Sequence, residues 1–340
     1  MRTNEGVRVE EVPSCPMCGT QGTTLYAGLR DRYWDAPGVW SFRGCSSCGH
    51  HWLDPRPAPE DVGMLYGSYF SHATVPPLPF VGDGFWPRAN RGVLDLLGYR
   101  GIARDAAERR LGRLFRLVPP LWDECDQAVR SVEGPPRGTL LDLGCGNGAY
   151  LVLMRALGWT VRGVEVDPVA VGVARGLELD VIESPIEDAT LPSDSHDVVT
   201  LSHVVEHVAD PVRVLEVARE TLTPGGTLWI ITPNVKSWGH RKFGAAWFHL
   251  DPPRHLHLFS RRNLGECARR AGLRVSRSWT TGRGHLVYDG SVSVRTTGRF
   301  QVGHLSTVAS MRDRWFRVFE RLLVTVRPEA GEEIYVACTK

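Results

Sequence analysis

The stretch from Leu140 to Gly148 reads LLDLGCGNG and joins an apolar run to a segment of helical character. Its three glycines allow the backbone to turn tightly and to approach a ligand closely. The helix that follows would offer unpaired N–H groups at its N-terminus. The spacing is G-x-G-x-G, whereas a dinucleotide-binding loop has G-x-G-x-x-G, and an ordinary strand-to-helix turn can also be rich in glycine. The stretch therefore predicts a strand, a turn and a helix, with a candidate ligand site at the turn.

On the C-terminal side of this turn, apolar runs alternate with helical patterns. We expect strands at 139–143, 161–166, 181–182, 198–201 and 228–232, helices near 150–157, 168–176, 211–222 and 261–271, and two final strands at 273–280 and 333–339. Such alternation is typical of a mostly parallel sheet that is covered on both faces.

An acidic residue ends the second predicted strand. Glu165 follows Gly144 by 21 residues. At the end of this strand, a carboxylate can accept hydrogen bonds from both ribose hydroxyls of an adenosine. The glycine turn and this acid together predict a nucleoside-binding site.

These motifs resemble those of the seven-stranded class I S-adenosylmethionine (SAM) dependent methyltransferases. The likeness runs in the family's order through LDLGCGNG at 141–148, VEVDP at 164–168, HDVV at 196–199, HVVEHVADP at 203–211 and LTPGG at 222–226. The resemblance implies an α/β fold with a doubly wound, mostly parallel, Rossmann-like sheet of seven strands. It also implies SAM as the cofactor.

The resemblance implies a role for each cofactor residue. Backbone groups of the three glycines would adjoin the methionine part, Glu165 would hold the ribose, and Val166 would flank the adenine. Ser184-Pro-Ile-Glu departs from the commoner Gly-Asp-Ala near the adenine edge. Asp142 either contacts the ligand or stabilises the turn, and Tyr66 and Tyr69 either cover the sulfonium or pack in the core. The predicted cofactor set is Asp142, Gly144, Gly146, Gly148, Glu165, Val166, Ile186, Glu187, Ser202, Tyr66 and Tyr69.

Three polar residues follow the fourth predicted strand. His203, Glu206 and His207 are spaced i, i+3 and i+4, so a helical turn would place them on one face. They match the H-x-x-E-H signature of some zinc proteases, but the surrounding cofactor motifs favour another role. Some RNA and quinone methyltransferases bind a divalent ion here with two acids and a histidine, and His203 replaces the first acid. Metal binding, acid/base or substrate-orienting chemistry, and structural hydrogen bonding all remain open.

A second histidine cluster follows the fifth predicted strand. The segment 247–260, WFHLDPPRHLHLFS, resembles a loop in a bacterial subgroup of these methyltransferases. Its prolines predict an extended, flexible loop, in which His255 and His257 would project to the same side. Either could be the general base that removes a hydroxyl proton during methyl transfer, or the pair could pin the loop. We expect His255 or His207 to be the base, with His203 and His257 as further candidates, and no catalytic metal.

The N-terminal region contains two C-x₂-C pairs, each followed by glycine. They are Cys15 with Cys18 and Cys45 with Cys48, separated by 26 residues. Thiolates at this spacing can close a tetrahedral zinc site, and four protein ligands leave no open position for chemistry. A structural zinc ion is therefore predicted. The other four cysteines are scattered among apolar neighbours, which indicates buried thiols in a reducing compartment.

The length of 340 residues predicts more than one compact domain. We expect a four-cysteine, zinc-ribbon-like module at 1–60, a loop and helical connector or lid at 61–135, and the methyltransferase domain at 136–340. The first region is too short to hold a stable core without the metal.

The net charge and the apolar runs of the sequence limit the classes of binding partner that can be expected. With 40 basic and 38 acidic residues the net charge is +2, which gives no electrostatic reason to expect nucleic acid or an anionic membrane. No apolar run has the length of a signal peptide or a membrane span. We expect a soluble, cytoplasmic protein with a small-molecule acceptor, and the oligomeric state stays open.

The stretch DPRPAPE at 54–60, which leads to YGSYF at 66–70, resembles N-terminal segments of zinc-bearing methyltransferases from bacterial glycan and natural-product pathways. Because those enzymes often modify sugars, this resemblance implies O-methylation of a small acceptor that is either polar or glycosylated. The alternatives are C- or N-methylation of a sugar or natural product, and a catalytically inactive methyltransferase-like module that binds a protein.

Overall fold

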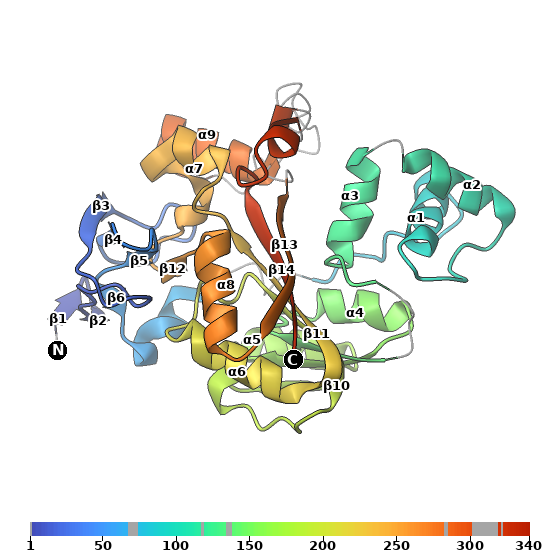
Figure 1. Cartoon of the computed structure of the whole chain (residues 1–340), viewed down its shortest axis with the longest axis horizontal. Coiled ribbons are helices and arrows are strands. Elements are labelled where there is room, and N and C mark those ends of the chain that lie inside the picture. Colours follow the sequence, from blue (N-terminus) through green and yellow to red (C-terminus); the bar gives the residue numbers. More distant parts are fainter. Residues whose placement is uncertain are drawn as a thin grey trace. The chain divides into compact units, whose positions relative to one another are not determined.

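A computed structural model describes residues 2–66, 74–116, 119–133, 138–281, 285–300, 319–320 and 322–340 (Figure 1). Contacts group the chain into two compact units. The first unit comprises Met1–Tyr69, Ser202–Arg219 and Ile230–Thr339, and the second comprises Phe70–Leu201, Glu220–Trp229 and Lys340. The three domain ranges proposed above follow other boundaries and stay a prediction.

The main sheet has seven strands in the order β13-β14-β11-β10-β7-β8-β9. Strands β10, β7, β8 and β9 pair in parallel, and β13 pairs with β14 antiparallel. The strands are β7 (Thr139–Leu143), β8 (Thr160–Glu165), β9 (Val181–Glu183), β10 (His196–Ser202), β11 (Leu222–Pro233), β13 (Arg274–Thr281) and β14 (Glu333–Thr339). The predicted α/β fold with a seven-stranded, mostly parallel sheet is confirmed.

Four helices alternate with these strands close to the predicted positions. They are α4 (Ala149–Ala156), α5 (Pro168–Gly176), α6 (Pro211–Thr221) and α8 (Arg261–Arg270). Asp167 caps α5 by accepting the N–H of Val169, and Ser260 caps α8 by accepting that of Asn263. The predicted strand at 228–232 is longer than expected, because the LTPGG motif is part of β11.

The second unit contains the core of the cofactor half of the sheet. Leu140, Leu141 and Leu143 of β7 are completely buried. Strand β7 is therefore buried on both faces, as expected for a central parallel strand. This unit also contains α1 (Phe85–Leu96), α2 (Ala106–Phe115) and α3 (Pro119–Ala128), so the predicted connector is helical.

The first unit combines the cysteine region with a much later segment. Strands β3 (Thr23–Leu29), β4 (Trp40–Gly44) and β5 (His51–Leu53) form an antiparallel sheet with β12 (His257–Leu258). Their shared core contains Trp40, Phe42, Leu53, Trp247, Leu250, Leu256 and Leu258. The N-terminal region therefore does not bury its apolar side chains alone.

The described part of the chain contains further elements. They are β1 (Arg2–Asn4), β2 (Val7–Glu10), β6 (Arg56–Pro57), η1 (Pro59–Tyr66), η3 (Ile186–Asp188), α7 (Trp238–Phe243), η4 (Gly244–Ala246), η5 (Phe248–Leu250) and α9 (His285–Thr297). Within that part, none of the helices is both long enough and apolar enough to cross a membrane.

Candidate functional site

The glycine turn is fastened to the end of the neighbouring strand. Glu165, the last residue of β8, accepts the N–H of Gly146 on Oε2 at 2.7 Å. Its Oε1 accepts the N–H groups of Val166 and Asp167 at 2.9 and 3.0 Å. One carboxylate therefore fixes the turn after β7 to the turn after β8, and its remaining lone pair, on Oε2, can accept a ligand hydroxyl.

All three glycines of the turn have positive φ angles, at 76° for Gly144, 55° for Gly146 and 80° for Gly148. At Gly148, a Cβ atom would lie 2.3 Å from Cδ1 of Leu179. This glycine is therefore required both by its backbone conformation and by the close packing at the start of α4.

Asp142 precedes the glycine turn and is held in place by hydrogen bonds. The residue is completely buried, and its Oδ1 accepts hydrogen bonds from Thr200 at 2.6 Å and from Arg130. Burial raises the pKa of this carboxyl, while the charge of Arg130 opposes the rise. These partners favour the turn-stabilising alternative over direct ligand contact.

The residues proposed to flank the adenine differ in exposure. Val166 is 60% exposed directly after β8, and Ile186 is buried at the start of η3. Glu187 is partly buried beside it. The exposed side chain of Val166, next to Glu165, offers an apolar surface at the place where the family motif would put the adenine ring.

His203 follows β10 and lies between two carboxylates. Its Nδ1 is 3.2 Å from Oε1 of Glu206, and its Nε2 is 3.3 Å from Oε1 of Glu333. Burial disfavours the charged ring, but the hydrogen bonds and charges of both acids outweigh it and raise the pKa of His203 to about 10. A doubly protonated ring has no lone pair for a proton, so this geometry favours a fixed cation over a base.

The predicted helical turn at this motif is instead a non-helical turn, and α6 begins only at Pro211. The turn still gathers a second group, because Glu206, His207 and His255 offer ligand atoms within 4.8 Å of one another. Glu206 is almost completely buried and accepts the hydroxyl of Thr232 at 2.9 Å. Although burial opposes ionisation, the hydrogen bond and charge of His203 lower the pKa of Glu206 to about 2.

Two histidines of this group have the same tautomer. Nδ1 of His207 is 3.0 Å from the carbonyl oxygen of Arg254, and Nδ1 of His255 is 2.8 Å from that of His249. Because a carbonyl only accepts, each Nδ1 carries the hydrogen and each Nε2 has a lone pair. Burial lowers the pKa of His207 to about 4, so its ring is neutral near pH 7.

The loop at 251–260 is not the flexible loop that its prolines predicted, since all ten of its residues are buried. His255 and His257 also have different neighbours, contrary to the expected common side. The ring of His255 lies 4.6 Å from that of His207, whereas Nδ1 of His257 is 3.1 Å from Nε2 of His50. Packing of 256–258 against the N-terminal region separates the two side chains.

An ion pair that the sequence did not reveal holds this loop. The guanidinium of Arg254 is completely buried and donates to both oxygens of Asp31 at 2.8 and 2.9 Å, as well as to Asp251. Asp31 and Arg254 are 223 residues apart in the chain. No local pattern signals a pairing of that length, and only the DPPR sequence of the loop draws attention to Arg254.

Three predicted cofactor residues remain, namely Tyr66, Ser202 and Tyr69. The hydroxyl of Tyr66 is 3.1 Å from Nδ1 of His207, which links it to the histidine group. Ser202 is the last residue of β10. Tyr69 lies outside the described residues.

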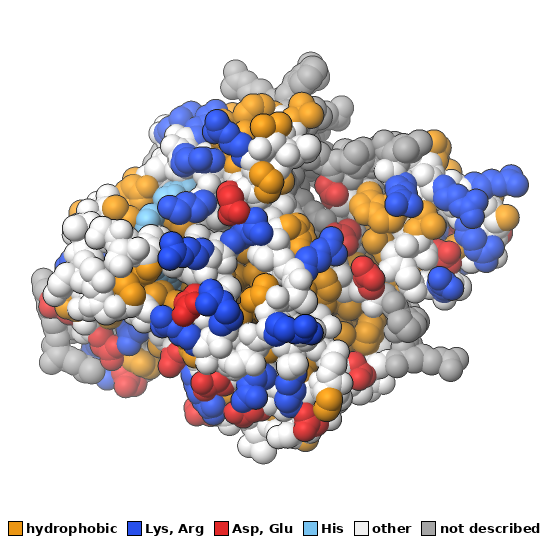
Figure 2. Space-filling view, viewed as in Figure 1, with side chains coloured by type: hydrophobic (Ala, Val, Ile, Leu, Met, Phe, Trp, Pro, Cys, Tyr) orange, Lys and Arg blue, Asp and Glu red, His pale blue; other side chains and the backbone are white. Residues whose placement is uncertain are grey.

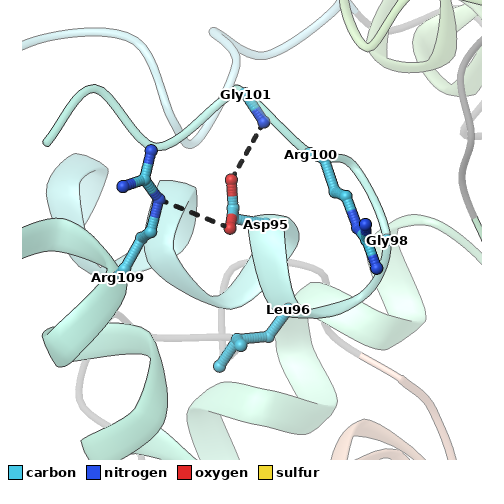
Figure 3. A pocket seen from close by; sticks show the side chains of 6 residues that line it. All are labelled: Asp95, Leu96, Gly98, Arg100, Gly101 and Arg109. Carbon is cyan, nitrogen blue, oxygen red and sulfur yellow. Dashed lines mark hydrogen bonds and ion pairs between the residues drawn. The ribbon is translucent and has the colours of Figure 1, made fainter. Parts of the chain in front are cut away.

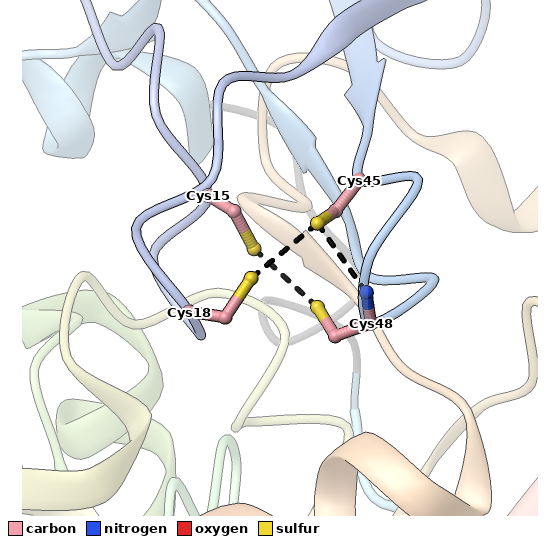
Figure 4. Close-up of side chains that lie close together, drawn as sticks. All are labelled: Cys15, Cys18, Cys45 and Cys48. Carbon is pink, nitrogen blue, oxygen red and sulfur yellow. Dashed lines mark hydrogen bonds between the residues drawn. The ribbon is translucent and has the colours of Figure 1, made fainter.

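The four predicted zinc ligands converge in the first unit, with the thiols directed toward one another (Figure 4). Sγ of Cys15 is 3.6 Å from that of Cys48, and Sγ of Cys18 is 3.4 Å from that of Cys45. A tetrahedral ion with Zn–S bonds of about 2.3 Å separates its sulfur ligands by about 3.8 Å. The donor set and spacing therefore fit structural zinc.

Comparison with known proteins places this arrangement in a family. Residues 107–278 match the model of a methyltransferase domain. A protein of Cereibacter sphaeroides named ubiquinone biosynthesis O-methyltransferase is 37% identical over 146 residues, which cover 39% of this chain and 59% of that protein. A protein of the same name from Paraburkholderia xenovorans is 32% identical over 151 residues, covering 41% and 65%. The chain thus spans less than two thirds of the length of these relatives.

Among solved structures, geranyl diphosphate C-methyltransferase from Streptomyces coelicolor is 15% identical, with a TM-score of 0.47 over 84% of this chain and 99% of that one. The family match covers half of the chain and includes the glycine turn, Glu165 and the histidine motif after β10. The chain belongs to the class I SAM-dependent methyltransferase family.

Proposed function

We propose that this chain methylates a hydroxyl group of a small acceptor, with SAM as the methyl donor. The observation that carries the proposal is the carboxylate of Glu165, which joins the glycine turn after β7 to the end of β8. This is the element that a nucleoside cofactor needs, because it combines backbone N–H groups with a hydroxyl acceptor.

The chain's own residues would act by binding, orienting and accepting a proton. SAM supplies a methyl group on a sulfonium that is already activated. Glu165 would hold the ribose, and the glycines at 144 and 146 would let the backbone approach the methionine part. Much of the acceleration would come from holding the acceptor oxygen in line with the methyl carbon.

His207 is the best-supported general base among the histidines. Its Nδ1–H is donated to the carbonyl of Arg254, so the lone pair of Nε2 can accept the hydroxyl proton. His255 has the same tautomer and is the second candidate. As the acceptor oxygen bonds to the methyl carbon and the carbon–sulfur bond breaks, the hydroxyl proton would pass to this lone pair.

The acceptor is proposed as a small polar molecule. The likeness of the N-terminal segment to methyltransferases of glycan and natural-product pathways favours a sugar-containing natural product. The curated relatives are named for ubiquinone biosynthesis, so intermediates of that pathway belong in the same substrate panel.

A metal-assisted variant of this reaction is the second candidate. It is favoured by the convergence of Glu206, His207 and His255, each within 4.8 Å of the others. Metal-ligating histidines commonly donate their second ring N–H to a carbonyl, as both of these do. If this variant holds, a chelator should abolish turnover and added Mg²⁺ or Mn²⁺ should restore it. Turnover unaffected by chelator supports the metal-free base.

Calorimetric titration with SAM and S-adenosylhomocysteine tests the proposal first. Binding of both is expected, and failure of both at millimolar concentration would remove the enzyme hypothesis. Incubation with cell extracts and SAM should then give an acceptor whose mass rises by one methylene unit. Nuclear magnetic resonance of that product separates O- from N- and C-methylation. Cofactor binding without any methylated product would favour the inactive protein-binding module.

A further inference from the structure

Helices α1 and α2 form a rigid hairpin in the second unit (Figure 1). A Cβ atom at Gly112 would lie 2.1 Å from the carbonyl oxygen of Gly92, so the two backbones are in direct contact. Arg91, 3% exposed, donates to Glu108 and to the carbonyls of Phe80 and Gly82. The surface of this hairpin is therefore preformed.

Arginines outnumber acids two to one on this hairpin. Residues 81–116 contain eight arginines, four acidic residues and no lysine or histidine. Each acid has an arginine partner, in the pairs Asp83–Arg104, Asp95–Arg109, Asp105–Arg88 and Glu108–Arg91. Figure 3 shows one of them, with Asp95 between Arg109 and the N–H of Gly101.

Four arginines remain without an acidic partner among the residues that the structure describes. They are Arg100, Arg110, Arg113 and Arg116, and all four are exposed. Arg110, Arg113 and Arg116 follow one another at three-residue spacing along and just beyond α2, which keeps them on neighbouring faces. Figure 2 shows basic side chains gathered over this helix, whereas both signs are mixed over the rest of the face.

Large apolar side chains are exposed at the same end of the hairpin. Phe85 is 55% exposed, Trp86 61% and Leu114 56%. The rings of Phe85 and Trp86 lie 6.0 and 6.3 Å from that of Phe115, which fixes their position beside the end of α2. Exposed aromatic groups that adjoin unpaired arginines mark an interaction surface.

We propose that this arginine and aromatic end of the α1–α2 hairpin docks on an anionic lipid surface. Trp, Phe and Leu can enter the boundary between headgroups and acyl chains, while arginines on an adjacent face bind lipid phosphates. The aliphatic Leu114 and Val81, 63% exposed, favour this partner over nucleic acid, because base stacking uses aromatic groups. The inference does not depend on methyl transfer.

Co-sedimentation of the full chain with lipid vesicles tests the proposal. We expect binding to vesicles of phosphatidylcholine with phosphatidylglycerol, and at least tenfold weaker binding to phosphatidylcholine alone. The double variant Arg110→Glu/Arg113→Glu and the single variant Trp86→Ala should each reduce binding to the anionic vesicles at least tenfold. In the double arginine variant, the remaining binding to anionic vesicles should also depend less on salt concentration.

The matched control is Arg269→Glu/Arg270→Glu, which makes the same charge change on the exposed face of α8 and should bind like the wild type. Circular dichroism checks that each variant is folded. The proposal fails if anionic vesicles do not bind, if the α8 control loses as much affinity as the α2 variant, or if a single-stranded RNA binds more tightly than the vesicles. Because no readout involves turnover, these outcomes are separate from those for methyl transfer.

Discussion

Hydrogen-bond partners give different properties to histidines that look alike in the sequence. His203 has a carboxylate at each ring nitrogen and is held as a cation. His207, four residues later, has a backbone carbonyl at Nδ1 and a pKa lowered to about 4 by burial. The first is therefore suited to electrostatic positioning and the second to proton acceptance.

Replacement of His207 by Gln should lower kcat by about 10²- to 10⁴-fold, because the proton acceptor is lost. The affinity for SAM should stay within about twofold, since the glycine turn and Glu165 are held together by their own hydrogen bonds. A base must be deprotonated to act, so wild-type turnover should persist as pH falls from 8 to about 5.5, below the usual pKa of about 6.5 for histidine. Steady-state kinetics across this range measures both effects, and a loss in kcat of less than tenfold would contradict the role of His207.

Replacement of Glu165 by Gln should weaken SAM binding at least tenfold. Hydrogen bonds to a charged acceptor contribute about 1.5–3 kcal/mol each, and the neutral amide can accept on only one atom. Asp180→Asn is the matched control, because Asp180 is an exposed carboxylate of the same unit that pairs only with Arg162 among the described residues. Calorimetric titration compares the two variants, and equal affinities would mean that the ribose site is elsewhere.

Some helices and strands approach one another closely because glycine, which has no side chain, lies at the point of contact. Gly92 and Gly112 allow α1 and α2 to touch, and Gly148 allows α4 to start beside Leu179. A helix interior favours alanine over glycine by roughly 1 kcal/mol, and at Gly92 and Gly112 the direct contact of the two backbones leaves no room for the larger residue.

Gly112→Ala should destabilise the chain by about 1–3 kcal/mol, because the new methyl group overlaps the carbonyl of Gly92. Gly265→Ala in α8 is the opposite case, since nothing lies within 4 Å of its added Cβ. This control should stabilise by about 0.5–1 kcal/mol through helix propensity. Chemical denaturation measures both changes, and a stabilised Gly112→Ala would show that α1 and α2 are not packed this closely.

The Asp31–Arg254 pair joins the N-terminal region to the histidine loop. Asp31→Asn should destabilise by about 3–5 kcal/mol, because the buried guanidinium loses a charged partner. Glu266→Gln removes a partly exposed partner from Arg269 and Arg270 of α8 and should cost less than about 1 kcal/mol. Thermal denaturation of the two variants should therefore give clearly different Tm values, and similar values would argue against the buried pair.

At the scale of the whole molecule, the zinc-binding region and the histidine loop form one structural unit. Strand β12 contains His257 and pairs with β5, whose first residue is three positions after Cys48. The cysteine site therefore supports residues that are remote in the chain from the zinc knuckles.

The purified protein should contain about one zinc ion per chain. Cys45→Ser should lose the metal, lower Tm and reduce turnover, because the sheet that holds 257–258 loosens. Ser46→Ala, within the same knuckle, should keep the metal. Elemental analysis and thermal denaturation give the answer, and metal-free wild-type protein purified without chelator would exclude the zinc assignment.

Much of the fold could be predicted because its signals are local. Strand β7, its glycine turn and Glu165 are identified by periodicity and spacing within 27 residues, and the four cysteines by two short repeats. Strand and helix periods depend on neighbouring backbone angles, and a tight turn depends on glycine at a few positions. For these features, the sequence contains the whole physical cause.

Tertiary structure alone decided the hydrogen-bond partners of each histidine and the distribution of charge over the surface. The tautomer of His207 depends on the carbonyl of Arg254, and the position of Arg254 depends on Asp31, 223 residues away from it in the chain. A net charge of +2 likewise conceals the unpaired arginines of α2. Such properties arise from burial and from partners brought together by folding, and no short-range pattern contains them.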